Sequence, residues 1–103
     1  MTDKTVAIEI LKQLGGHKFI AMTGAKNFFA TNNSMGFHIP GGGGRAKRGI
    51  NFIKITLTSL DLYDMEFKRI RGTEITDIAK REGVYNDMLQ DVFTNETGFA
   101  ATL

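Results

Sequence analysis

Apolar residues at helical spacing open and close this chain, and the residues between them alternate in the manner of strands. Over residues 6–14 the apolar positions recur every three or four residues, which predicts an amphipathic helix that ends at Gly15 and Gly16. Over residues 85–93 they fall at i, i+3, i+4, i+7 and i+8, which predicts a second helix that ends near Gly98. Each helix therefore has one apolar face that another layer must cover.

Period-two patterning between the helices predicts that this other layer is an antiparallel sheet. Residues 50–58 carry the clearest pattern, because Ile53, Ile55 and Leu57 share one side. Strands are also expected over residues 19–23, 35–39 and 62–71, with a shorter one over 74–79. The expected fold is a single α+β domain over residues 1–103, with an antiparallel sheet of four to five strands packed against an N-terminal and a C-terminal helix.

Composition excludes several kinds of chemistry. The 103 residues contain no cysteine, which excludes disulfides, thiolate zinc sites and a cysteine nucleophile. No apolar run approaches the roughly 20 residues that span a bilayer, and residues 1–4 mix acid and base unlike a signal peptide. We therefore expect a cytoplasmic protein that has no membrane partner.

The common catalytic and metal-binding patterns do not occur in the sequence. His17 and His38 stand alone rather than at metal-ligand spacing, and there is no Gly-x-Ser-x-Gly nucleophile motif. The glycine-rich residues 41–49 precede a strand rather than a helix, so they do not match a Walker or dinucleotide-binding loop. We expect no catalytic residue, no metal and no cofactor, and hence a protein that is not an enzyme.

One pair of carboxylates bears on that expectation. Asp64 and Glu66 share a strand face at a spacing of about 7 Å, which the acids of glycosidases also use. Lys68 continues the same face, so a solvated surface of alternating charge explains the pair more simply.

Charge is distributed unevenly along the chain. Residues 1–58 contain eight Lys and Arg against two Asp and Glu, whereas residues 59–103 contain five against nine. If the fold keeps the two halves on different surfaces, the basic one attracts an anionic partner. If the halves interleave as neighbours in a sheet, their charges largely neutralise each other.

The most basic stretch of the chain lies in its glycine-rich segment. Residues 41–49 are expected to be a mobile loop between two antiparallel strands, since ordering four consecutive glycines costs much backbone entropy. Basic side chains on such a loop can contact a phosphate backbone. The predicted binding residues for nucleic acid or a nucleoprotein are Arg45, Lys47 and Arg48, with Lys26 and Lys54 as secondary candidates.

Phenylalanines of the basic half have two possible roles. They can offer stacking surfaces for bases, or they can belong to the core, where most phenylalanines lie. The residues concerned are Phe28, Phe29, Phe37 and Phe52. Oligomeric state stays open for a related reason, because Phe28, Phe29 and residues 99–103 can either extend an interface or complete the core.

Two other functions remain open beside nucleic-acid binding. A basic loop also suits a protein-binding inhibitor that docks on a host enzyme or a bacterial defence system, in the manner of an anti-CRISPR protein. The third possibility is a small sponge that holds an anionic ligand between subunits, with Lys26 and Arg48 around the ligand.

Two segments of the chain resemble those of a known family along their whole length. Residues 15–28 (GGHKFIAMTGAKNF) and residues 83–93 (GVYNDMLQDVF) resemble a family of small uncharacterised proteins encoded by bacteriophages and bacterial mobile elements. The resemblance implies a mobile-element origin and a bacterial host, and it favours a role in DNA metabolism or in interference with a host defence. It implies no site residues. Residues 41–49 are longer and richer in glycine than the resemblance leads us to expect.

Overall fold

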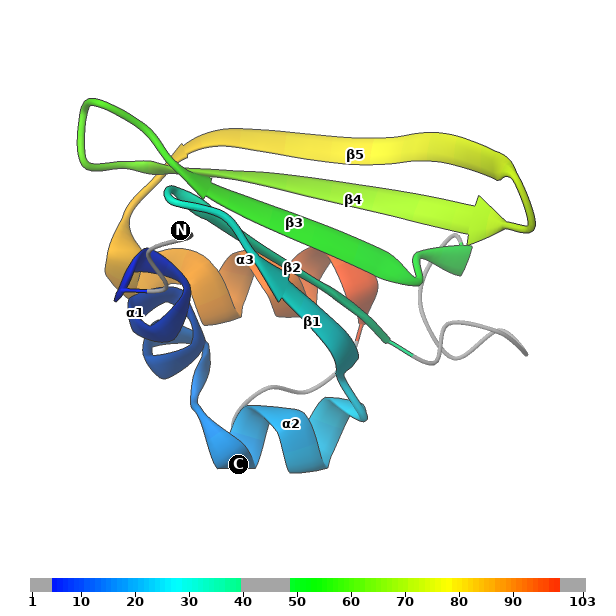
Figure 1. Cartoon of the computed structure of the whole chain (residues 1–103), viewed down its shortest axis with the longest axis horizontal. Coiled ribbons are helices and arrows are strands. Elements are labelled where there is room, and N and C mark those ends of the chain that lie inside the picture. Colours follow the sequence, from blue (N-terminus) through cyan, green and yellow to red (C-terminus); the bar gives the residue numbers. More distant parts are fainter. Residues whose placement is uncertain (1–4, 40–48, 99–103) are drawn as a thin grey trace.

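The computed structural model describes residues 5–39 and 49–98, which form two layers, a five-stranded sheet and a set of helices on one of its faces (Figure 1). The helices are α1 (Thr5–Leu14), α2 (His17–Thr23) and α3 (Leu89–Thr97), the last preceded by the 3-10 turn η3 (Asn86–Met88). The strands are β1 (Lys26–Ala30), β2 (Ser34–His38), β3 (Phe52–Leu57), β4 (Tyr63–Arg71) and β5 (Glu74–Val84).

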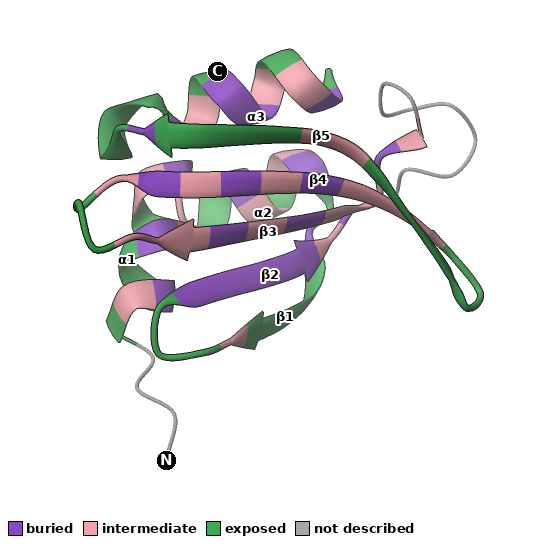
Figure 2. Cartoon of the chain, turned by 90° about the horizontal axis from the view of Figure 1, so that it is seen from above, coloured by how far each residue is buried: buried purple, intermediate pink, exposed green. Residues whose placement is uncertain are grey.

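The sheet is a meander in which every strand pairs antiparallel with the next one along the chain, in the order β1-β2-β3-β4-β5. The predicted α+β class is therefore confirmed, with an antiparallel sheet packed against N-terminal and C-terminal helices. Viewed from above, the sheet has all the helices behind it and its near face uncovered (Figure 2). None of the helices in the described ranges is long and apolar enough to cross a membrane.

The strand expected over residues 19–23 is wrong, because this segment forms helix α2. Phe19 and Thr23 are both buried, as residues four apart on one helix face are, and the Thr23 hydroxyl donates to the carbonyl of Phe19 at 2.7 Å. Gly16 and Gly24 bracket the helix with positive φ values of 62° and 72°. A short apolar run does not distinguish a buried strand from a buried helix, and here the flanking glycines decide.

The last strand ends later, and the last helix begins later, than the sequence predicts. The short strand expected over residues 74–79 extends to Val84, which is buried and pairs with Tyr63. As a result Tyr85 and Met88, which belong to the predicted helical stripe, are exposed, and α3 begins at Leu89. The predicted end of this helix near Gly98 is confirmed.

The core lies between the sheet and the helices and is rich in phenylalanine. Phe19 of α2 makes edge-on ring contacts with Phe37 of β2 and Phe93 of α3, at centroid distances of 5.4 and 5.0 Å. All three rings are fully buried. The Gln90 side-chain amide donates to the carbonyl of Leu14 at 2.6 Å, which joins the start of α3 to the end of α1.

Candidate functional site

The face of the sheet opposite the helices carries side chains that the core does not use. On β3, Phe52, Lys54 and Thr56 point to this open face, while the buried Ile53 and Ile55 point to the helices, as the alternation predicts. The antiparallel register continues the open face onto the next strand. Its pairs are Phe52 with Lys68, Lys54 with Glu66 and Thr56 with Asp64.

A bulge in β1 brings two further residues to the open face. Lys26 pairs with His38 and Phe29 pairs with Gly36, and the register shifts between these pairs at Asn27, whose φ is 56°. Without the extra residue, Lys26 and Phe29 would lie on opposite faces. With it, both face the same way as His38, while Phe28 turns to the helix side and contacts Phe37.

Phe29 and Phe52 form a stacked pair in the middle of this face. Their ring centroids are 5.9 Å apart and the ring planes differ by 9°. β2 runs between their two strands, and only a glycine there leaves room for the pair. A Cβ on Gly36 would lie 2.1 Å from Cε1 of Phe29, so the Phe29 ring rests directly on the Gly36 backbone.

His38 extends the aromatic surface along β2. Its ring meets that of Phe52 edge-on, with centroids 5.0 Å apart and an interplanar angle of 69°. Its Nδ1 atom is buried and has no hydrogen-bond partner among the described residues. Three rings from three neighbouring strands, Phe29, His38 and Phe52, therefore form one continuous patch, which we call the aromatic patch.

The charges of the open face are divided between its two sides. From residue 10 to residue 60 the sequence contains no Asp or Glu, so β1, β2 and β3 contribute only Lys26 and Lys54. The acids lie on β4 and β5. The basic and acidic halves of the chain thus lie side by side in the sheet and meet between β3 and β4.

The lysines on the acidic side are neutralised by their neighbours. Lys68 Nζ lies 2.9 Å from Asp77 and 3.6 Å from Glu66, and Lys80 Nζ lies 3.9 Å from Glu82. The hydrogen bond to Asp77 is the main cause that raises the pKa of the Lys68 ammonium, and Glu66 raises it further. Lys54 faces Glu66 across the strands but forms no salt bridge with the described residues. An approaching anion therefore meets uncompensated positive charge on the β1–β3 side.

The structure brings together two of the predicted binding residues. Lys26 and Lys54 both lie on the open face, on either side of the aromatic patch. Arg45, Lys47 and Arg48 lie outside the described residues. Of the four phenylalanines, Phe37 belongs to the core, Phe28 lies on the helix side and half exposed, and Phe29 and Phe52 lie on the open face.

Metal-ligating side chains and paired carboxylates are the other candidate groups in the part of the chain that the structure describes. No group of three or more His, Asp or Glu side chains could hold a metal ion among these residues. Asp64 and Glu66 share the open face, but Asp64 accepts a hydrogen bond from the Gly83 amide at 3.2 Å and Glu66 pairs with Lys68. Both carboxylates are thus engaged in holding the sheet surface.

No family model matches the chain, and no curated protein or solved structure matches it.

Proposed function

We propose that this chain binds single-stranded nucleic acid on the open face of its sheet, as a non-enzymatic accessory protein of a phage or mobile element. The observation that carries the proposal is the stacked pair of Phe29 and Phe52 over Gly36, beside two lysines and without a carboxylate on the same three strands. Aromatic rings next to a positive surface are what single-stranded nucleic acid requires, because bases stack on rings while cations contact phosphates.

The aromatic patch favours a single strand over a duplex. In a duplex the base faces are stacked on one another and do not reach a sheet surface, whereas unpaired bases can be splayed out onto aromatic side chains. The patch is on the surface of the sheet rather than in a cleft, so a strand can cross it without threading. Lys26 at the sheet edge and Lys54 on β3 lie where phosphates would pass on the two sides of the rings.

Removal of either ring should weaken binding strongly. Loss of one base–aromatic stack costs about 1–3 kcal/mol, so Phe52→Ala and Phe29→Ala should each raise the Kd by roughly five- to 150-fold. Fluorescence anisotropy with labelled single-stranded DNA and RNA at low and physiological salt measures this. Double-stranded DNA of the same sequence should bind more weakly to the wild-type chain.

A matched variant on the same face distinguishes base stacking on the aromatic patch from general electrostatic attraction. Lys80→Ala removes one positive charge from β5, where Glu82 already neutralises it, and should leave the Kd within about twofold. Equal losses of binding affinity in Phe52→Ala and Lys80→Ala would contradict the stacking proposal. Equal binding of single and double strands would contradict it as well.

Removal of unpaired cations should change the salt dependence rather than the base preference. Lys54→Ala should weaken binding to all sequences and lower the slope of log K against log salt by about 0.7, the contribution of one phosphate contact in a single strand. The triple variant Arg45→Ala, Lys47→Ala and Arg48→Ala should lower that slope further. An unchanged slope in the triple variant would remove these three residues from the interface and leave the open face as the site.

A further inference from the structure

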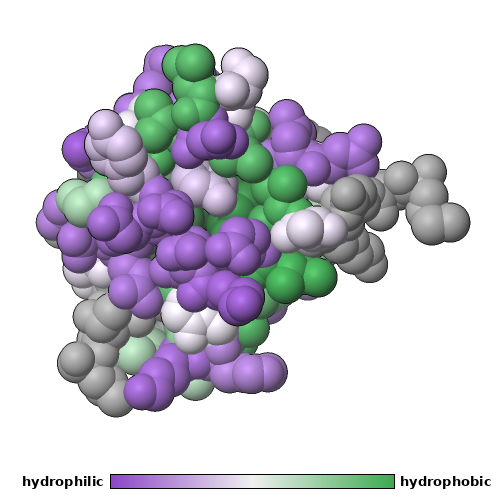
Figure 3. Space-filling view, turned by 90° about the vertical axis from the view of Figure 1, so that its left-hand side faces the viewer, coloured by the Kyte–Doolittle hydropathy of each residue, from purple (hydrophilic) through white to green (hydrophobic). Residues whose placement is uncertain are grey.

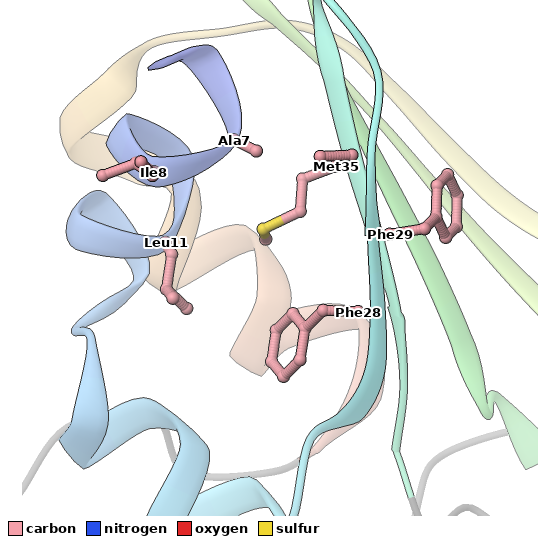
Figure 4. Close-up of a pocket in the computed structure, with 7 residues that line it drawn as sticks. Ala7, Ile8, Leu11, Phe28, Phe29 and Met35 are labelled. Atoms are coloured by element: carbon pink, nitrogen blue, oxygen red, sulfur yellow. The ribbon is translucent and has the colours of Figure 1, made fainter. Parts of the chain in front are cut away.

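An apolar groove lies on the other side of the edge strand β1, between that strand and helix α1 (Figure 4). Its walls are apolar side chains, namely Ala7, Ile8 and Leu11 of α1 with Phe28, Ala30 and Met35 of the first two strands. Figure 3 looks at the side of the molecule on which α1 lies, and shows apolar surface (green) gathered between hydrophilic regions (purple). Ile8 is 59% exposed and Phe28 is 39% exposed, so this surface is left open to water.

β1 also has backbone groups that the sheet does not use. The Thr31 amide donates to the carbonyl of Ser34 at 2.9 Å, which makes Phe29 and Gly36 the next hydrogen-bonded pair along the ladder. Ala30, between them, occupies a non-hydrogen-bonded position. Its N–H and C=O therefore point away from β2 toward the free edge, where another strand can pair with them.

Half-exposed phenylalanines stand on both faces of this one strand. Phe28 points into the groove on the helix side, and Phe29 points to the open face on the opposite side (Figure 4). Phe29 is 40% exposed, nearly the same as Phe28. A strand added at the edge would cover part of both rings at once, which a ligand on either face alone would not.

The opposite edge of the sheet is built differently. β5 carries charged, exposed side chains along its length, including Asp77, Lys80 and Glu82, and its pairing with β4 contains two register shifts. Charged side chains along an edge strand hinder its pairing with another chain. β1 has one charge, Lys26, and it lies at the start of the strand beyond the bulge.

We infer that the free edge of β1 pairs with β1 of a second copy of this chain, antiparallel across a twofold axis near Phe29. A twofold contact is self-complementary, so each copy brings the same half-exposed rings and covers those of its partner. In this register Phe28 of one copy lies opposite Ala30 of the other, so the outward backbone groups of the two strands meet, and the two Lys26 side chains lie at opposite ends of the contact. No like charges face each other in the paired strands.

The area available sets the strength of this dimer. A Phe buries about 200 Å² when fully covered, so each half-exposed ring offers about 80 Å². With Ile8 and the backbone of one short strand, the contact falls below the range for stable specific interfaces, among weak and transient contacts. The dimer is therefore a weak one that forms as concentration rises, and it does not depend on the proposed nucleic-acid binding.

Sedimentation equilibrium of the full chain, without nucleic acid, tests the inference. The mean mass should rise from monomer toward dimer between about 5 and 500 µM, the range in which small interfaces dissociate. Ile8→Lys, on an exposed helix position, should raise the dimer Kd at least tenfold. Leu60→Lys is the matched control, because Leu60 is 77% exposed in the β3–β4 turn, and it should leave the Kd unchanged.

Amide hydrogen exchange gives a second, residue-specific measurement that needs no variant. Exchange of the Ala30 amide should slow as the protein concentration rises, because that N–H finds a partner only in the dimer. A chain that stays monomeric over the whole range overturns the inference and leaves a foreign peptide as the occupant of the groove. A dimer that Ile8→Lys does not weaken, or one without protection at Ala30, overturns it too.

Discussion

Phe19→Ala should lower the free energy of unfolding by about 3–5 kcal/mol, the largest effect we expect from one substitution in this chain. The Phe19 ring is fully buried and contacts rings of β2 and α3, so its removal opens a cavity where three elements meet. The total free energy of unfolding of a natural domain is about 5–15 kcal/mol, so the loss removes a large part of the stability of this one. Urea denaturation followed by far-ultraviolet circular dichroism measures it.

Ala21→Lys is the matched control for that measurement, and it also tests the helix itself. In helix α2 residue 21 is exposed, so a lysine there should change the free energy of unfolding by less than about 0.5 kcal/mol. In a strand, residues 19, 21 and 23 would share a buried face, and the lysine would lower the free energy of unfolding several times more than it does on an exposed helix position. A large loss in Ala21→Lys would therefore contradict the helical structure of this segment.

Gly36→Ala should lower the free energy of unfolding by about 1–3 kcal/mol, although alanine is ordinarily the more favourable residue in a strand. The new Cβ would lie 2.1 Å from Cε1 of Phe29, so the ring must leave its stack on Phe52. Nucleic-acid binding should fall about as far as in Phe29→Ala, because the same ring is displaced. Denaturation and anisotropy on one protein preparation measure both effects.

The sign of the Gly36→Ala effect should reverse when the ring is absent. In a Phe29→Ala background the three atoms nearest to the new methyl group, all in the Phe29 ring, are gone, so Gly36→Ala should be neutral or slightly stabilising there. The difference between the two backgrounds is the coupling free energy of the pair. A Gly36→Ala cost that is the same with and without the Phe29 ring would show that the ring does not rest on the glycine.

Much of the fold could be predicted from periodicity, and the part that could not has a definite cause. Alternation over residues 50–58 and 62–71 correctly placed β3 and β4, because an antiparallel sheet with one buried face imposes a strict period of two. The strand expected over residues 19–23 was wrong because a short apolar run fits either a strand or a helix. The information that settles them is the pair of glycines on either side, each with a positive φ.

The candidate site could be predicted only in part, for a similar reason. Alternation around Ile53 and Ile55 puts Phe52 and Lys54 on the face away from the core, as the structure has them. Phe29 could not be placed in this way, because the bulge at Asn27 shifts the phase of β1 by one residue. Asn is one of the few residues that adopt a positive φ readily, so Asn27 was the available signal.

The hydrogen bond from Gln90 to Leu14 joins the two ends of the chain, so the fold can be completed only after α3 has been synthesised. The meander forms from neighbours in sequence, so its hairpins can assemble as they leave the ribosome. Helix α1, made first, meets α3, made last, across 76 residues of chain. Until translation is nearly finished, the apolar sides of α1 and of the sheet have no cover from α3, and a nascent chain at that stage is the form that chaperones would encounter.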